Sequence, residues 1–288
     1  MLYTIEEIMK SGTYLSDGAW GTEFAKKDIR RGIPNELLNE IEPDLVRAVA
    51  ESYVAVGSDI ILTNTFGANR ILLSVHGYGD KVRELNRRGV EISRDAAAGK
   101  ALVFASLGPT GKMIVMGDIT RDEAEEVFRE QAVAMAEAGA DAIVVETMGD
   151  LEEYTAAIRA SRSTGLPVVG CMSFDSGKAL DRTMYGISVE QMVKAAEDEG
   201  IEMVGANCGV GIENYVRIAE NLIRSTRLPI WIKPNAGLPE IEGGKTVYRM
   251  TPNEFSGHVR ELVDLNVRVI GGCCGSTPEH IRAARAVV

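Results

Sequence analysis

The stretch VRVIGGCCG, residues 267–275, joins an apolar run to two adjacent cysteines, Cys273 and Cys274. In a regular strand neighbouring side chains point to opposite faces, so adjacent cysteines could not bind one object. Glycines on both sides of the pair release the backbone from this alternation. A vicinal disulfide is the alternative, but adjacent Cα atoms lie about 3.8 Å apart, below the usual disulfide span of about 4.4 Å or more. We therefore expect the two thiols to share a metal ion.

Seven further apolar runs precede this one, and amphipathic segments separate them. The helix signals between the runs include four Ser, Thr or Asp residues placed three positions before Glu or Gln, which predict capping boxes at Thr120, Asp150, Ser188 and Thr251. Eight strands that alternate with helices, at roughly 30 to 40 residues per unit, predict an α/β fold of the (β/α)8 TIM barrel type. A doubly wound open sheet is the competing fold. The predicted strands are 13–17, 59–64, 101–108, 141–147, 166–174, 202–208, 228–235 and 267–274.

Composition limits the domain organisation and the partners. The 288 residues contain no linker or low-complexity tract, so we expect a single domain over residues 1–288. The net charge is −11, from 31 basic and 42 acidic residues, which disfavours nucleic acid and anionic membranes as partners. The N-terminus MLYTIEEIMKSG has no signal-peptide pattern, and no apolar run approaches about 18 residues. A cytoplasmic location is therefore expected, and four cysteines in such a chain favour metal binding or catalysis over disulfides.

A third cysteine, Cys208, ends the sixth predicted strand in the motif GANCGVG. The carboxyl ends of barrel strands open on one rim, so Cys208 can meet Cys273 and Cys274 there. Three sulfurs suit zinc, at about 2.3 Å each, and leave a fourth position open for a substrate. Core packing is the alternative for buried cysteines. We prefer it for Cys171, which lies inside its strand, and we expect none of the three histidines to be a ligand.

A zinc ion with three thiolates is electron-rich, so it suits the binding and activation of a fourth thiol better than the activation of water. The first strand ends in DGAWGT, residues 17–22, a turn whose amides could bind a carboxylate. Asp17 and Glu146 could hold an ammonium group, although an Asx-turn and an ordinary ion pair are equally compatible with their spacing. Asn207 and Asn235 flank the site, and Asn235 could fill the fourth zinc position or serve a turn. These groups together describe an amino-acid thiol such as homocysteine.

Six collinear motifs resemble the homocysteine S-methyltransferase family, and most of all the homocysteine-binding module of cobalamin-dependent methionine synthases. The resemblance covers essentially the whole chain and implies a zinc barrel in which Cys208, Cys273 and Cys274 are the ligands. It also implies that Asp17 and Glu146 bind the amino group and that amides around Gly18, Ala19 and Trp20 meet the carboxylate. The motifs are DGAWGTEF (17–24), LTNTFGANR (62–70), GPTG (108–111), GANCGVG (205–211), KPNAGLP (233–239) and GGCCGSTPEHI (271–281).

The resemblance implies a zinc-dependent methyltransferase that converts homocysteine to methionine. The D-x-H-x-x-G corrinoid signature is absent from the sequence, so we expect methylcobalamin on a corrinoid protein that acts in trans or in a longer parent chain. S-methylmethionine and S-adenosylmethionine are the alternative donors. A lyase or isomerase with a phosphate site and a lysine such as Lys233 is the alternative of another class, and a zinc or thiol sensor is a third. The predicted loops 18–42, 175–187 and 236–250 are long enough to cover the site or receive a donor.

Overall fold

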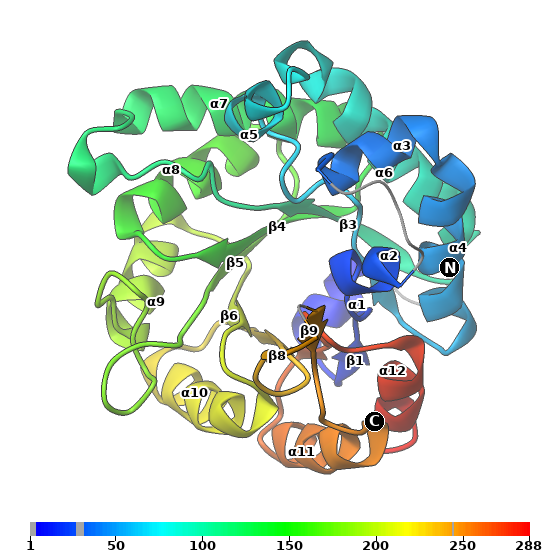
Figure 1. Cartoon of the computed structure of the whole chain (residues 1–288). Coiled ribbons are helices and arrows are strands. Elements are labelled where there is room, and N and C mark those ends of the chain that lie inside the picture. Colours follow the sequence, from blue (N-terminus) through cyan, green and yellow to red (C-terminus); the bar gives the residue numbers. More distant parts are fainter. Residues whose placement is uncertain (1–3, 27–31, 244) are drawn as a thin grey trace.

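The computed structural model describes residues 4–26, 32–243 and 245–288 and has eight parallel strands in a nearly closed barrel surrounded by helices (Figure 1). The strand order is β1-β10-β7-β6-β5-β4-β3-β2, and the hydrogen-bonded neighbours are parallel. The predicted (β/α)8 barrel is confirmed, and each strand lies in its predicted run to within one residue. The barrel strands are β1 (Tyr14–Leu15), β2 (Ile60–Ile61), β3 (Leu102–Leu107), β4 (Ala142–Met148), β5 (Val168–Met172), β6 (Met203–Cys208), β7 (Ile230–Pro234) and β10 (Val269–Ile270).

The helices begin largely where the sequence signals place them. Thr120, Ser188 and Thr251 form the expected capping boxes. The box predicted at Asp150 is only half formed, because the Glu153 carboxylate accepts hydrogen bonds from Thr110 instead. The helices are α1 (Ile5–Lys10), α2 (Gly21–Ala25), α3 (Leu38–Ile41), α4 (Pro43–Ala55), α5 (Arg70–Val75), α6 (Val82–Ala97), α7 (Arg121–Glu137), α8 (Leu151–Arg162), α9 (Val189–Glu199), α10 (Ile212–Ser225), α11 (Pro252–Asp264) and α12 (Pro278–Arg285), with 3-10 turns at Asn35–Leu37, Gly79–Lys81 and Ile114–Met116.

Two aspartates join β1 to β2, the first and last strands of the sheet order. The Asp59 amide donates to the Leu15 carbonyl at 2.8 Å, and the Leu15 amide donates to Asp59 Oδ2 at 2.8 Å. The Leu62 amide donates to Asp17 Oδ2, also at 2.8 Å. Between β1 and β2, aspartate carboxylates therefore accept hydrogen bonds that backbone carbonyls accept between the other strands. Asp17 thus helps to close the barrel.

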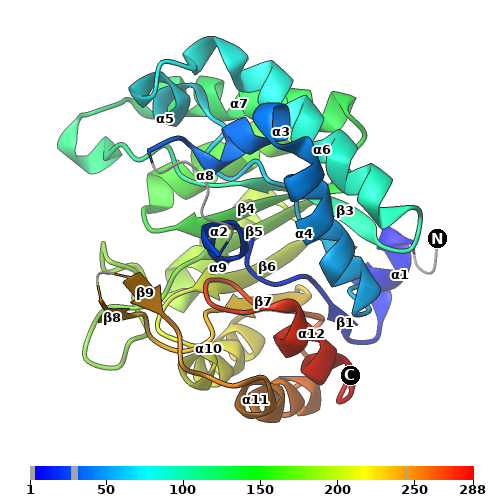
Figure 2. The same cartoon turned by 45° about the vertical axis from the view of Figure 1, so that its right-hand side comes forward.

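An apolar cluster fills the amino-terminal half of the barrel interior. Phe104 and Trp231 stack with their ring centroids 5.9 Å apart, and Cys171 is fully buried beside them, as predicted for a core residue. Ile8 of α1 joins the same cluster and covers this end of the barrel. Figure 2 shows α1 on the opposite side of the strands from the hairpin formed by β8 (Glu240–Glu242) and β9 (Lys245–Val247). The apolar filling leaves polar chemistry to the other end of the barrel, where the strands end.

The loops that follow the strands surround the barrel mouth. The segment 236–250, predicted as a loop, contains an antiparallel hairpin of β8 (Glu240–Glu242) and β9 (Lys245–Val247). Residues 27–31 of the predicted loop 18–42 and residue 244 lie outside the described residues. Within the part of the chain that is described, no helix has the length and apolar character needed to cross a membrane.

Candidate metal centre and substrate cavity

Three thiols meet at the barrel mouth, as the sequence predicted. Cys208 is the last residue of β6, while Cys273 and Cys274 follow β10. Their three sulfur atoms all lie within 4.8 Å of one another, and they form the one group of three metal-binding side chains found among residues 4–26, 32–243 and 245–288. A tetrahedral zinc ion with Zn–S bonds of about 2.3 Å needs sulfurs about 3.8 Å apart. The donor set therefore fits zinc in chemistry and in spacing.

The backbone around the thiols is held by specific hydrogen bonds. The Cys273 amide donates to the Pro234 carbonyl at 2.6 Å, and Ser276 Oγ donates to the Cys273 carbonyl at 2.7 Å. Gly275 has φ +82°, so a glycine does release the turn after the pair. Cys208 itself adopts φ +65°, which no local sequence pattern predicts and which costs a non-glycine residue about 1–3 kcal/mol. Such strain is typical of a functional site.

The charges of the three thiols depend on one another. Hydrogen bonds from Cys208 and Cys273 lower the pKa of Cys274 to about 3. The hydrogen bonds that Cys208 gives to Cys273 and Cys274 raise the pKa of its own thiol. Without a metal ion, the cluster therefore favours the state with one thiolate and disfavours the state with three thiolates. A bound dication is the group that would let all three thiols ionise together.

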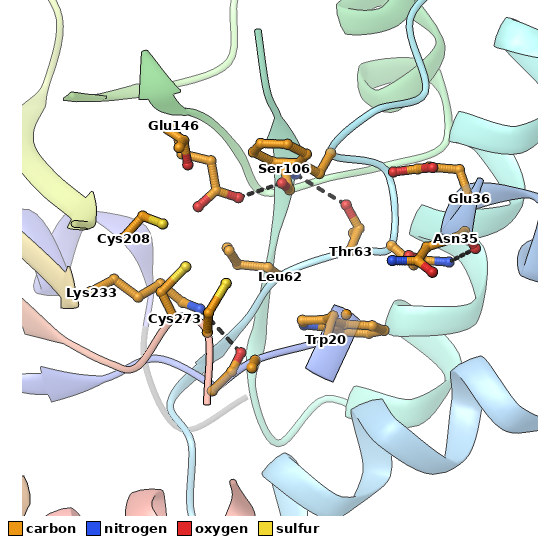
Figure 3. A pocket seen from close by; sticks show the side chains of 17 residues that line it. Trp20, Asn35, Glu36, Leu62, Thr63, Ser106, Glu146, Cys208, Lys233 and Cys273 are labelled. Carbon is orange, nitrogen blue, oxygen red and sulfur yellow. Dashed lines mark hydrogen bonds between the residues drawn. The ribbon is translucent and has the colours of Figure 1, made fainter. Parts of the chain in front are cut away.

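A cavity of about 230 Å³ begins at the thiols and runs towards α2. In Figure 3 Cys208, Cys273 and Lys233 lie on one side of it, and Trp20, Asn35 and Glu36 lie on the other. The cavity is large enough for a small amino acid. Its lining residues are Gly18, Ala19, Trp20, Gly21, Asn35, Glu36, Leu62, Thr63, Asn64, Phe66, Ser106, Glu146, Thr147, Cys208, Lys233, Cys273 and Cys274.

Glu146 is the predicted ammonium-binding acid whose side chain lines the cavity. It lies near the end of β4, where the register with β5 shifts, and its side chain lines the cavity while only 5% exposed. Ser106 Oγ donates to Oε1, as Figure 3 shows, and Asn207 Nδ2 donates to Oε2 at 3.1 Å. Burial raises the pKa of Glu146 to about 7. A cation bound in the cavity would favour its ionised form.

Asn207 does not line the cavity, although it was predicted among the substrate-binding residues. Its side chain is fully buried and accepts from the Thr147 amide at 2.6 Å, while Nδ2 donates to Thr147 Oγ1 at 2.7 Å. Thr147 has φ +60°, which is exceptional for a β-branched residue. Asn207 therefore holds the strained end of β4 and, through it, the Glu146 carboxylate.

Asp17 also lies behind the cavity wall, fully buried. Its Oδ2 accepts from Trp20 Nε1 at 2.7 Å and from the Leu62 amide, and its Oδ1 lies 3.2 Å from Lys233 Nζ. Lys233 Nζ also donates to the Gly18 carbonyl at 3.1 Å and to the Gly272 carbonyl. The lysine ammonium thus donates to two carbonyls and forms an ion pair with Asp17. Lys233 shares the inward face of β7 with Trp231, and a charged residue at an inward strand position is the signal that could have found it.

The remaining predicted residues are placed as follows. Asn235 Nδ2 donates to the Gly209 carbonyl at 2.6 Å, and its buried Oδ1 has no hydrogen-bond partner in the described part of the structure. The Asn235 amide donates to the Cys208 carbonyl at 3.1 Å, although Asn235 is not among the residues that line the cavity. Gly18, Ala19 and Trp20 line the cavity, but the Ala19 amide already donates to Ser276 Oγ at 3.1 Å.

The chain matches the family model described as homocysteine S-methyltransferase over residues 14–288. The methionine synthases of Mycobacterium tuberculosis and Mycobacterium leprae are each 31% identical to it in alignments of 301 positions, which cover 98% of this chain and 25% of theirs. The chain thus spans about a quarter of the length of these relatives. The solved homocysteine methyltransferase MmuM from Escherichia coli has TM-scores of 0.81 in its oxidized form and 0.80 in its metallated form, at 22% identity and 97% coverage of both chains, which supports the fold.

Proposed function

Because this chain belongs to the homocysteine S-methyltransferase family, we propose that it transfers a methyl group to homocysteine and yields methionine. The observation that carries the proposal is the group of three thiols at one end of an amino-acid-sized cavity, with a buried acid further along it. Cys208, Cys273 and Cys274 would hold zinc. When bound, the zinc would lower the pKa of the substrate thiol and keep its sulfur as a nucleophile at neutral pH. Reduced thiols suit the cytoplasm, where we place the protein.

The amino-acid end of homocysteine would lie against Glu146. This carboxylate faces the cavity and is fixed by Ser106 and Asn207, so it can receive an ammonium group without rearrangement. Asp17 would act less directly, since it holds Lys233 and Trp20. Backbone amides of the Gly18–Trp20 turn would meet the carboxylate, with the Ala19 amide committed to Ser276.

Asn235 would occupy the fourth ligand position before the substrate arrives. Its free Oδ1 supports this role, because a buried acceptor without a hydrogen bond lowers the stability of the fold unless it binds a cation or a donor. Substrate sulfur would then replace a neutral amide oxygen, which is an easy exchange compared with loss of a thiolate.

The methyl donor would be methylcobalamin on a corrinoid protein, in trans or in a longer parent chain. Two features support a large donor: the relatives named methionine synthase are about four times as long as this chain, and loops after β3, β5 and β7 project at the mouth (Figure 2). These loops carry exposed apolar side chains, which favour contact with a partner. They are Val115, Met116, Met184, Leu238 and Ile241. S-methylmethionine and S-adenosylmethionine are the alternative donors.

The lyase or isomerase alternative loses its main support. It needs a lysine or an acid–base pair that is free in the barrel mouth, whereas the Lys233 ammonium is engaged by Asp17 and two carbonyls. The sensor alternative remains an outcome of the experiment below.

Methionine formation tests the proposal. Zinc-loaded protein is incubated with homocysteine and, in separate reactions, with methylcobalamin, S-methylmethionine or S-adenosylmethionine. We expect methionine from methylcobalamin, and we expect Cys273→Ser to lose most zinc and nearly all transfer. Cys171→Ala is the matched control, since this thiol is buried outside the cluster, and it should keep one zinc per chain. Full activity of Cys273→Ser, or zinc binding without methionine from any donor, would contradict the proposal.

A further inference from the structure

The turn that carries Cys208 has an unusual backbone. Cys208 and Gly209 both have positive φ, +65° and +67°. The first of these is unfavourable for a residue with a side chain, and such a conformation persists only when surrounding contacts hold it. The position of the Cys208 sulfur therefore depends on the contacts of this turn.

Three successive carbonyl groups provide such contacts. The Cys208 carbonyl accepts from the Asn235 amide at 3.1 Å, and the Gly209 carbonyl accepts from Asn235 Nδ2 at 2.6 Å. The Asn207 carbonyl, which precedes them, accepts from the Tyr215 hydroxyl at 2.7 Å. The turn is thus held from two sides, by the residue that follows β7 and by a side chain of α10.

The Tyr215 hydroxyl is itself fixed in place. Tyr215 is fully buried near the start of α10, which packs against β6 and β7 (Figure 1). Its oxygen accepts from the Phe174 amide at 3.3 Å, just after β5, so its proton points to the Asn207 carbonyl. A Cβ added to Gly209 would overlap this oxygen. The hydroxyl therefore lies in close contact with the turn.

Asn207 connects this contact to both halves of the site. Its backbone leads directly into Cys208, while its Nδ2 donates to Glu146 Oε2 at 3.1 Å and to Thr147 Oγ1 at 2.7 Å. Tyr215 is not among the residues that line the cavity, so it acts through Asn207 and leaves the substrate side of the thiols free.

We propose that Tyr215 is a positioning residue of the metal centre, whose hydroxyl holds the Asn207 carbonyl and thereby the strained turn that directs the Cys208 sulfur towards the other two thiols. This inference rests on the proposed zinc ligation by the three cysteines. Loss of the hydroxyl removes one of the contacts that hold the turn, so the backbone of Cys208 relaxes and its sulfur moves away from the position that zinc requires. Zinc affinity should therefore fall.

Zinc affinity is the first test, measured by competition with a chromophoric chelator on the full chain. Tyr215→Phe keeps the buried ring and removes the hydroxyl, and we expect its zinc affinity to fall about 10- to 100-fold. Tyr154→Phe is the matched control. Tyr154 of α8 is equally buried, but its hydroxyl has no hydrogen-bond partner in the described part of the structure, so this variant should bind zinc within about twofold of the wild type.

The visible spectrum of the cobalt-loaded protein is the second test, because a loss of fold stability alone does not move it. Cobalt(II) in place of zinc has d–d absorption bands that report the arrangement of its ligands. We expect these bands to shift in Tyr215→Phe and to stay unchanged in Tyr154→Phe.

A second variant displaces the hydroxyl without removing it and decides if Tyr215→Phe does not fold. Gly209→Ala places a methyl group against the Tyr215 oxygen, and its zinc affinity should fall as well. Gly186→Ala is its control, since Gly186 has φ +81° but open space around it, so it carries the same backbone penalty without the overlap.

The outcomes separate this inference from the proposed function. Equal zinc affinities of the wild type and Tyr215→Phe, a loss that Tyr154→Phe shares, or an unchanged cobalt spectrum would overturn the inference. Zinc affinity of Gly209→Ala equal to that of Gly186→Ala would do the same. A wild-type chain that binds no zinc would instead refute the proposed function.

Discussion

Replacement of Glu146 by glutamine should stabilise the metal-free protein at alkaline pH. The carboxyl is buried against Ser106 and Asn207, and burial raises its pKa from 4.5 to about 7. Glutamine fits the same space, since its Nε2 can donate to Ser106 Oγ while its Oε1 accepts from Asn207. The variant therefore removes an ionisable group and keeps the contacts.

The sign of the effect follows from the direction of the shift. Because the folded pKa is above the unfolded one, the folded state holds the proton more tightly, and stability from Glu146 is complete below about pH 4.5. It is lost as the pH rises through about 7. A shift from 4.5 to about 7 corresponds to about 3 kcal/mol at 1.36 kcal/mol per pKa unit. Between pH 5 and pH 8, Glu146→Gln should gain about 2 kcal/mol relative to the wild type.

Urea unfolding at a series of pH values, with a chelator and a thiol reductant present, measures this difference. Titrating groups that do not interact with Glu146 act on both proteins and cancel. Glu152→Gln on the exposed side of α8 is the control and should stay within about 0.5 kcal/mol of the wild type throughout. A Glu146→Gln difference that does not change with pH would refute the reasoning. At pH 8 the same variant should bind homocysteine about 10-fold more weakly or worse, because it loses a charged partner for the ammonium.

Two further substitutions test how the site is held. Asn207→Ala should lower the free energy of unfolding by about 2–3 kcal/mol, because Thr147 and Glu146 lose their buried hydrogen-bond partner. Thr147→Gly in that background should restore about 1 kcal/mol, because glycine tolerates the positive φ. If urea unfolding shows no restoration, Asn207 does not hold a strained Thr147. Lys233→Met should lower the free energy of unfolding by about 3–5 kcal/mol, because Asp17 keeps a buried charge without its partner. Asp17→Asn in the same chain should recover part of this loss. If the losses of the two substitutions simply add in thermal unfolding, the two side chains do not stabilise each other as an ion pair.

Much of this architecture could be predicted from local patterns. Apolar runs and helix caps fixed the number and order of the strands, and because parallel strands end on one rim, Cys208 could be placed beside a pair 65 positions away. The β8–β9 hairpin also had a signal, since Gly243-Gly244 separates two short alternating runs. The signal is weak because each run is only three residues long.

The details of the site depend on contacts that no local pattern encodes. Asp17 was expected to face the substrate, but closure of the barrel brings the Leu62 amide and Lys233 to it first. Asn207 likewise turns to the backbone of a neighbouring strand, because Thr147 adopts a conformation that its residue type does not suggest. Pairings of this kind form only when strands distant in sequence are assembled, so they had to be seen in the structure.

Zinc K-edge X-ray absorption tests the central claim most directly, because it counts the sulfur atoms around the metal. We expect three sulfurs at about 2.3 Å in the zinc-loaded protein and four after homocysteine is added. A count that stays at three with saturating homocysteine, or zinc held without these thiols, would contradict a site built to take the substrate sulfur.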